Sequence, residues 1–280
     1  MNAYLKAYFS EKSTNGFLFD DNIGANPSPS ITTEFATVKT GTTIVGVACN
    51  DCVVLGADTR ATNGPIVADK DCEKIHRLSD NIFAAGAGTA ADLDHVTSLI
   101  EGNLELQKLQ MNRKPRVAHA VSMLSNHLYK YQGYVGAHLI VAGSDSTGNY
   151  VFQVSANGCI MQLPFTSMGS GSLCARSILE ARYRDGLTEN ECIELVSAAI
   201  RAGIYNDLYS GSNVNILIIK NNSVKHFRHF DTKASERIYR QPKPISFPVG
   251  TTPIISEKTE DLSSFVVEAP EVQIEDEDMD

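Results

Sequence analysis

The chain has 280 residues, of which 42% are hydrophobic, enough to bury a single large core in a sheet-rich fold. Its net charge of -9 is local, because residues 257–280 hold ten of the 33 carboxylates and one of the 24 lysines and arginines. The remainder is balanced and has no basic patch, so no nucleic-acid partner is expected. Neither a signal-type apolar leader nor an apolar run of about 18 residues occurs, so no membrane association is expected.

The first 41 residues are polar and weakly patterned, which predicts a flexible leader. Strands are then predicted around an Asn50-Asp51 turn and around a second turn at 79–81. Their ranges are 43–48, 53–57, 74–78 and 82–85. Two helices follow, one over about 89–109 and one that begins after Pro115, with apolar side chains at helical spacing.

Three further strands, 137–143, 150–155 and 159–163, come next, with Asn157-Gly158 as a hairpin turn. A helix is predicted for 172–183. Another opens with a capping box of Thr188 and Glu191 and is expected to stop at Gly203. A last hairpin over 214–230 turns at 221–222, and four prolines then punctuate an extended tail.

Strand pairs thus alternate with helix pairs along the chain. Because consecutive elements tend to pack together, this order predicts two antiparallel sheets that face each other, with helix layers outside. The fold class expected is α+β, in a four-layer αββα sandwich. The predicted strands are predominantly apolar, as they should be when both faces of each sheet are covered.

The six cysteines are expected to be small buried side chains of a protein from a reducing compartment. They are Cys49, Cys52, Cys72, Cys159, Cys174 and Cys192. Cys49 and Cys52 have CxxC spacing, and Cys72 with His76 could complete a zinc set. Because the CxxC falls on a strand turn and not at a helix start, neither metal nor redox chemistry is expected, and no cofactor.

Thr42 is the first candidate for chemistry, because it follows Gly41 at the head of a strand-like run. If the bond before it is cut, Thr42 carries a hydroxyl nucleophile and a free amine on one residue. An α-amine has a pKa of about 7.7–8.0, so it can act as a base near neutral pH. A threonine paired with its own amine is one known way to activate a weak hydroxyl.

Four local signals downstream fit this chemistry. A strand ends in Asp58 within Gly56-Ala57-Asp58-Thr59-Arg60, and Lys74 brings a cation to the start of another strand. Two strand-to-helix turns, 85–89 and 167–172, offer backbone N–H groups for an oxyanion and exposed hydroxyls. Taken singly, each signal also fits a structural role, such as a surface ion pair or a helix cap.

Taken together, these motifs resemble a catalytic β subunit of the eukaryotic proteasome core particle. The resemblance covers about residues 41–230 in the family order. It rests on Thr42-Thr43-Ile44, Gly56-Ala57-Asp58-Thr59-Arg60, Glu73-Lys74, Gly86-Ala87-Gly88, Met168-Gly169-Ser170-Gly171-Ser172 and Asn206-Asp207 with Ser210-Gly211-Ser212. It implies the sandwich of N-terminal nucleophile hydrolases, which agrees with the element order.

By this resemblance, residues 1–41 are a propeptide that is removed autocatalytically at Gly41–Thr42, and Thr42 is the nucleophile. Lys74 lowers the pKa of the catalytic group, and Asp58 holds Lys74 by charge pairing. Gly88 supplies the oxyanion-hole N–H. Ser170, Asp207 and Ser210 surround the amine.

The resemblance also implies cleavage after basic residues. The residues that it assigns to substrate binding are Thr62, Cys72, His76, Gly86, Gly88, Ala90 and Asp94. Gly86 leaves the pocket deep, and Asp94 can offer a carboxylate to an arriving Arg or Lys. The alternative is that Asp94 only stabilises the first turn of its helix.

The domains expected are 42–230 for the hydrolase and 231–280 for a C-terminal arm, whose apolar residues imply that it embraces a neighbouring subunit. Expected partners are the other α and β subunits of a barrel of stacked seven-membered rings, and polypeptide substrates, with assembly chaperones left open. The location expected is cytoplasmic and nuclear. The acidic end at 275–278 is expected to be solvated, with a regulatory motif as the alternative.

Two other function classes are weighed against this one. A non-catalytic ring subunit is disfavoured because Gly41, Thr42, Asp58 and Lys74 are all intact. A simpler bacterial-type threonine protease is disfavoured by the long leader and the long C-terminal arm.

Overall fold

The computed structural model describes residues 40–220, 223–236 and 254–266. The chain divides into two units, Met1–Arg237 and Ile238–Asp280. In the second unit, residues 254–266 contain one short 3-10 helix, η2 (Leu262–Phe265). The predicted turn at 221–222, the leader up to residue 39 and the acidic end at 275–278 lie outside the described residues.

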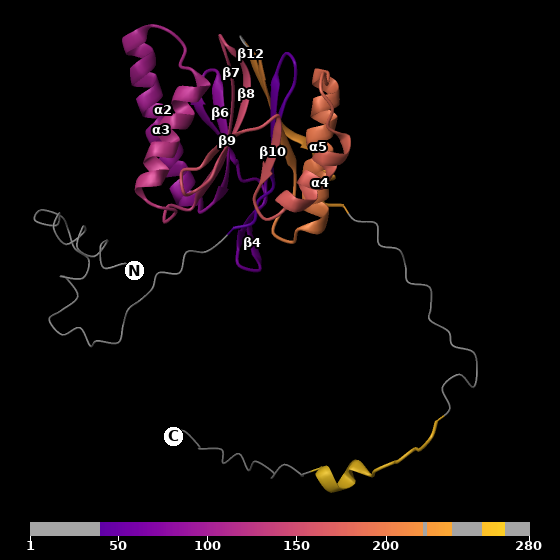
Figure 1. Ribbon diagram of the computed structural model, residues 1–280. Helices are drawn as coiled ribbons and strands as arrows, with labels where there is room; N and C mark the ends of the chain where they lie inside the picture. Colours follow the sequence, from indigo (N-terminus) through magenta and orange to yellow (C-terminus); the bar gives the residue numbers. More distant parts are fainter. Residues whose placement is uncertain (1–39, 221–222, 237–253, 267–280) are drawn as a thin grey trace, which may run out of the picture. The chain divides into compact units, whose positions relative to one another are not determined.

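Two five-stranded antiparallel sheets form the centre of the first unit (Figure 1). One sheet has the strand order β10-β1-β2-β11-β12. Its strands are β1 (Ile44–Ala48), β2 (Val53–Asp58), β10 (Phe165–Met168), β11 (Val214–Lys220) and β12 (Ser223–Asp231). The strand β1 is paired on both sides, with Ile44 opposite Met168 of β10 and opposite Ala57 of β2.

The other sheet has the order β5-β6-β7-β8-β9. Its strands are β5 (Ile75–Ser79), β6 (Ile82–Gly88), β7 (Ala137–Asp145), β8 (Gly148–Val154) and β9 (Ile160–Gln162). A small separate hairpin pairs β3 (Ala61–Asn63) with β4 (Ile66–Asp69). The strand β6 runs on to Gly88, so Gly86 is a strand residue opposite Leu139 and not part of a turn.

Four helices cover the outer faces of the two sheets (Figure 1). They are α2 (Ala90–Met111), α3 (Val117–Lys130), α4 (Ser172–Arg182) and α5 (Glu189–Asn206). The helices α2 and α3 pack on the sheet of β5–β9, while α4 and α5 pack on the sheet that contains β1. The predicted four-layer αββα sandwich is therefore confirmed.

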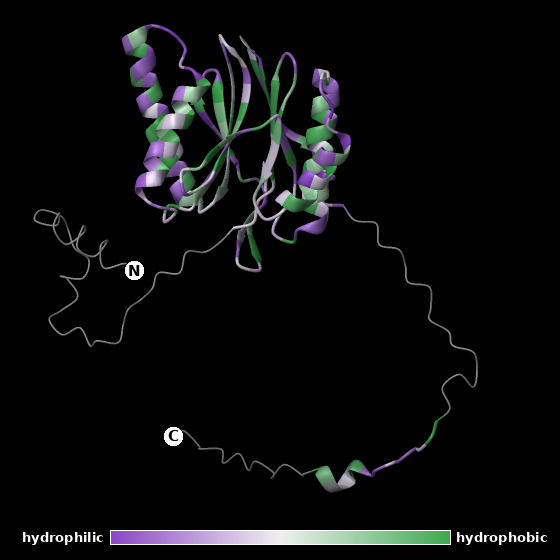
Figure 2. Ribbon diagram, viewed as in Figure 1, coloured by the Kyte–Doolittle hydropathy of each residue, from purple (hydrophilic) through white to green (hydrophobic). Residues whose placement is uncertain are grey.

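Three apolar clusters fill the spaces between the four layers. The cluster between the sheets includes Ile44, Leu55 and Ile140, all fully buried. The other two lie under the helix pairs, for example around Val196 of α5 and around Leu124 of α3. Figure 2 shows the apolar colouring concentrated on the strands and on the helix faces toward them. Burial on both faces explains why the central strands β1, β2 and β11 are largely apolar, whereas β12, at the edge of its sheet, is exposed and largely polar.

One predicted element boundary was wrong, and two elements were not predicted. The helix α5 does not stop at Gly203 but continues to Asn206. Gly203 is a packing residue, because a Cβ there would lie 2.5 Å from Thr43 Cγ2. The strand β10 and the hairpin β3–β4 were missed, since each of their strands has at most four residues and too little pattern to detect.

The prediction for the cysteines was also wrong in part. Cys49, in the β1–β2 turn, and Cys192 of α5 are joined in a disulfide. Among the free cysteines that the structure describes, Cys52 is buried but Cys159 is exposed. The disulfide joins residues 143 positions apart, a proximity that only the tertiary fold creates.

The described residues contain no helix long and apolar enough to span a membrane. They also contain no group of three or more His, Cys, Asp and Glu side chains placed to hold a metal ion.

Candidate active site

Thr42 lies two residues before β1 and is only 3% exposed. The strand β1 is paired on both sides from Ile44 onward, and the Thr42 carbonyl accepts a hydrogen bond from the Gly171 N–H at 3.3 Å. The preceding residue packs against the loop after α5. A Cβ on Gly41 would lie 1.8 Å from Tyr209 Cβ, so only glycine fits there. The chain is therefore held firmly on both sides of the Gly41–Thr42 bond.

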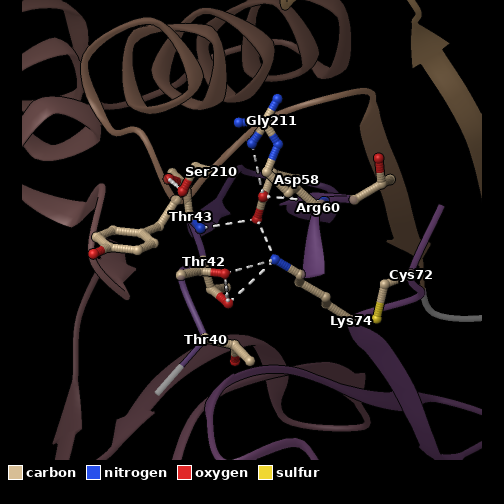
Figure 3. A network of polar contacts seen from close by, with 12 residues as sticks. Thr40, Thr42, Thr43, Asp58, Arg60, Cys72, Lys74, Ser210 and Gly211 are labelled. Atoms are coloured by element: carbon tan, nitrogen blue, oxygen red, sulfur yellow. Dashed lines mark hydrogen bonds and ion pairs between the residues drawn. The ribbon is translucent and has the colours of Figure 1, made fainter. Parts of the chain in front are cut away.

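Lys74 and Asp58 form a buried ion pair beside Thr42 (Figure 3). Lys74 Nζ lies 2.9 Å from Asp58 Oδ1, and the two side chains are 8% and 0% exposed. The Lys74 ammonium also donates to Thr42 Oγ1 and to the Gly41 carbonyl oxygen, both at 3.2 Å. The positive charge of Lys74 thus faces both the Thr42 hydroxyl and the carbonyl of Gly41, the residue before Thr42.

Three residues that were not predicted as site residues hold the Asp58 carboxylate. The Thr43 N–H donates to Oδ1 at 2.9 Å, and the Gly211 and Arg60 N–H groups donate to Oδ2 at 3.2 and 3.4 Å. Figure 3 shows these donors around Asp58. Such bonds compensate for removing the charge from water. The hydrogen bonds from Thr43 and Gly211 come from backbone N–H groups that the fold brings together. A pattern of side chains in the sequence therefore could not predict them.

A second network surrounds the Thr42 nitrogen. The Thr42 N–H donates to Ser170 Oγ at 3.0 Å, and the Ser170 hydroxyl donates to Asp207 Oδ2 at 2.5 Å. Ser210 Oγ donates to the same carboxylate oxygen at 2.7 Å and lies 2.8 Å from Thr43 Oγ1. Ser170, Asp207 and Ser210 are therefore brought together, and Ser170 is the one that contacts Thr42.

Two glycines bring backbone close to Thr42. Gly88 has φ +131, and a Cβ there would lie 2.0 Å from the Gly136 oxygen. Gly169 has φ +99, and a Cβ would lie 2.0 Å from the Thr42 carbonyl oxygen. Both positions are in the region that favours glycine. Thr40 Oγ1 also donates to the Gly88 carbonyl at 3.0 Å, so the last leader residues lie along this backbone.

The predicted specificity residues line a cavity of about 100 Å³ beside Thr42. They are Cys72, His76, Gly86, Gly88, Ala90 and Asp94. Gly86 packs closely on Leu93, since a Cβ there would lie 2.9 Å from Leu93 Cδ2. Thr62 is not in this cavity: it is buried, and its hydroxyl accepts a hydrogen bond from the Gly41 N–H at 3.2 Å.

The electrostatics of this cavity depend on four charged side chains and one histidine. Lys74 is compensated by Asp58, and Arg60 donates to the Leu208 carbonyl at 3.0 Å. Glu73 and Asp94 supply the negative charge, and the Asp94 side chain is 73% exposed. Burial lowers the pKa of His76, although the Asp94 carboxylate 3.7 Å away opposes this. His76 therefore adds no charge at neutral pH.

The zinc alternative does not form. Cys49 is in a disulfide, and Cys52 belongs to the core under α5, while Cys72 and His76 line the cavity beside Thr42. Cys49 and Cys52 therefore lie in a different part of the described structure from Cys72 and His76.

Comparison with known proteins agrees with this geometry. The proteasome subunit family matches residues 38–219. The chain is 50% identical to the probable proteasome subunit beta type-2 of Schizosaccharomyces pombe, over 81% of this chain and 84% of the relative. It is 49% identical to the beta type-7 subunit of Dictyostelium discoideum, over 82% and 86%, and 44% identical to the beta type-10 subunit of Bos taurus, over 82% and 84%. The chain therefore belongs to the proteasome subunit family, within its group of β subunits of types 2, 7 and 10.

Proposed function

We propose that Thr42 is the nucleophile of this chain, a trypsin-like threonine endopeptidase subunit of the proteasome, and that it becomes active when the Gly41–Thr42 bond is cut. One observation carries the proposal: Lys74 Nζ lies 3.2 Å from both Thr42 Oγ1 and the Gly41 oxygen, over the buried carboxylate of Asp58. A cation in that position stabilises negative charge on either oxygen.

The uncut chain already holds a hydroxyl nucleophile and a cation beside the bond that is to be cut. When the Thr42 hydroxyl oxygen attacks the Gly41 carbonyl carbon, negative charge develops on the Gly41 oxygen, which faces Lys74. The C–N bond then breaks, the hydroxyl proton ends on the Thr42 nitrogen, and an ester remains. Water hydrolyses the ester, which leaves a carboxylate on Gly41 and a free amine and hydroxyl on Thr42.

The released amine supplies the base that the uncut chain lacks. Its nitrogen is already placed beside Ser170, and Asp207 accepts from the Ser170 hydroxyl. The amine takes the Thr42 hydroxyl proton as the oxygen attacks a substrate carbonyl, and it returns the proton to the leaving nitrogen. The Gly88 N–H is proposed to stabilise the oxyanion. Hydrolysis of the acyl ester by water completes the cycle.

We assign the preference for basic residues to the cavity that contains Gly86 and Asp94. A long Arg or Lys stem lies along the space left by Gly86, and the cation meets the Asp94 carboxylate. A guanidinium–carboxylate pair gives both charge and geometric specificity. His76 stays neutral at pH 7 and does not repel the arriving cation.

A proteasome subunit assembles with other proteasome subunits, and we propose that this one lies in stacked seven-membered rings of α and β subunits, in the cytoplasm and nucleus. Polypeptides are the substrates, and assembly chaperones are a further partner class. The segment 254–266 supports an arm that packs on a neighbour, because Ile254, Ile255 and Phe265 are 82%, 95% and 71% exposed.

The test compares assembled particles that carry wild-type chain, Thr42→Ala or Thr42→Ser, which keeps the hydroxyl. Fluorogenic peptides ending in Arg, Leu or Asp report the activity, and N-terminal sequencing reports the leader. We expect wild type to begin at Thr42, and Thr42→Ala to keep its leader and lose Arg cleavage alone. Thr42→Ser should retain both reactions in part. Persistence of Arg cleavage in Thr42→Ala particles would refute the nucleophile assignment.

A further inference from the structure

A second cavity adjoins Thr42, separate from the one that holds Asp94. Its volume is about 660 Å³, and its lining includes Tyr134, His138, Gln153 and Arg176. The two cavities share Thr40, Thr42 and Gly88. Suppose that a peptide binds across Thr42 with its basic side chain in the first cavity. The peptide residues that follow the scissile bond then lie beside the second cavity.

The charge in this second cavity comes from Arg176. Among the described residues that line it, Arg176 is the only Lys or Arg, and none is Asp or Glu. Burial lowers the pKa of His138, so this imidazole is neutral at pH 7. Two carboxylates contact lining residues without lining the cavity themselves: Asp92 accepts a hydrogen bond from the Gly136 N–H at 2.8 Å, and Asp207 accepts one from the Ser170 hydroxyl at 2.5 Å.

Arg176 is also free to bind. It lies on the exposed side of α4, and no ion pair or hydrogen bond of its guanidinium occurs within the parts of the chain that the structure describes. Two other exposed arginines of the first unit are paired with carboxylates, Arg184 with Glu191 and Arg201 with Asp231. An unpaired guanidinium at the edge of a cavity can form a strong, directional pair with a carboxylate.

We infer that the second cavity receives the leaving side of the substrate and that Arg176 selects an acidic side chain there. This inference rests on the proposed function and extends it: the preferred site has a basic residue before the cleaved bond and Asp or Glu just after it. An exposed charge pair of this kind changes kcat/KM by about two- to five-fold.

The experiment uses assembled particles and internally quenched peptides with Arg before the bond and Glu, Gln or Lys after it. The Glu/Gln ratio of kcat/KM is measured for wild type, Arg176→Gln, Arg176→Glu and the control Arg182→Glu. Arg182 is exposed on the same helix but does not line the cavity. Because each ratio comes from one preparation, differences in the amount of active particle cancel.

We expect a wild-type ratio above one that falls at higher salt, a ratio near one in Arg176→Gln, and a preference for Lys in Arg176→Glu. Arg182→Glu should match wild type. A wild-type ratio of one or less overturns the inference even if no Arg176 variant assembles, as does an equal effect of Arg182→Glu. The Thr42→Ala particles decide the proposed function separately, since they report whether the Arg peptides are cleaved at this site at all.

Discussion

Gly41 and Tyr209 are packed so closely that a methyl group on Gly41 would lie 1.8 Å from Tyr209 Cβ. The contact comes from the loop after α5, far from Gly41 in sequence, and it holds the residue whose carbonyl faces Lys74. A glycine before Thr42 is therefore a steric requirement of the uncut chain.

The first prediction is that Gly41→Ala slows removal of the leader. The added methyl must displace the Gly41 carbonyl or Tyr209, and a misplacement of about 1 Å can cost about 100-fold in rate. N-terminal sequencing and a gel-mobility time course measure the effect. Because Gly41 is absent from the cut chain, a version synthesised to begin at Thr42 should have wild-type activity. Normal processing of Gly41→Ala would show that the Tyr209 contact does not constrain the reaction.

The second prediction concerns the buried ion pair. Lys74→Ala leaves the fully buried Asp58 carboxylate without its cation, which costs about 3–5 kcal/mol in the free energy of unfolding. It also removes the charge next to Thr42 Oγ1, so both leader removal and Arg cleavage should be lost. Thermal unfolding of the full chain and peptidase assays measure the two effects. Lys70→Ala, an exposed lysine four residues earlier, is the matched control and should change neither.

The third prediction is a pH dependence of specificity. Because burial lowers the pKa of His76 below its ordinary value of 6.5, the histidine gains a proton in the folded chain only below that pH. The new cation repels a basic substrate side chain. The kcat/KM ratio of an Arg peptide to its neutral citrulline analogue should therefore fall as the pH is lowered, and stay flat in His76→Gln. An identical pH profile in both would assign the effect to another group.

The lowered pKa of His76 also makes the free energy of unfolding depend on pH. The unfolded chain binds the His76 proton before the folded chain does, so the free energy of unfolding decreases as the pH falls below about 6.5. His76→Gln should reduce this slope in a denaturant titration.

The fourth prediction compares two glycines within helices. Gly203→Ala places a methyl 2.5 Å from Thr43 Cγ2 and should destabilise the chain by about 1–3 kcal/mol. It should also lower activity, because Thr43 contacts both Asp58 and Ser210. Gly102→Ala in α2 meets no atom within 4 Å and should stabilise by about 0.5–1 kcal/mol. Denaturant unfolding measures both, and stabilisation by Gly203→Ala would contradict the packing argument.

Much of the fold could be predicted because periodicity and turn chemistry are local. The capping box of Thr188 and Glu191 begins α5 as expected. The predicted end of that helix was wrong, because Gly203 is not a C-cap residue. It is a glycine inside α5 that packs closely against Thr43. The strand β10 was missed because its four residues carry too little pattern, and its pairing with β1 is set by the tertiary fold.

The candidate site shows the same division. The motifs of the family order identify Thr42, Asp58 and Lys74, and the structure places these three in contact. Their roles remain proposals. Thr62 was expected in the substrate cavity but contacts the Gly41 N–H, and Thr43 and Tyr209 were not identified. These residues act through backbone contacts and shape, which leave no motif in the sequence.

The pairing of β1 on both edges has a consequence for how the subunit is switched on. The strands β10 and β2 pair with the backbone from Ile44 onward, and the Gly171 N–H binds the Thr42 carbonyl. We therefore expect the new N-terminus at Thr42 to keep its position after cleavage. On the proposed mechanism, latency comes from one amide bond and not from a misplaced loop. Activation is then the cleavage of this one bond, by acyl transfer to the Thr42 hydroxyl and hydrolysis of the ester, and the time of cleavage decides when the precursor becomes an active protease.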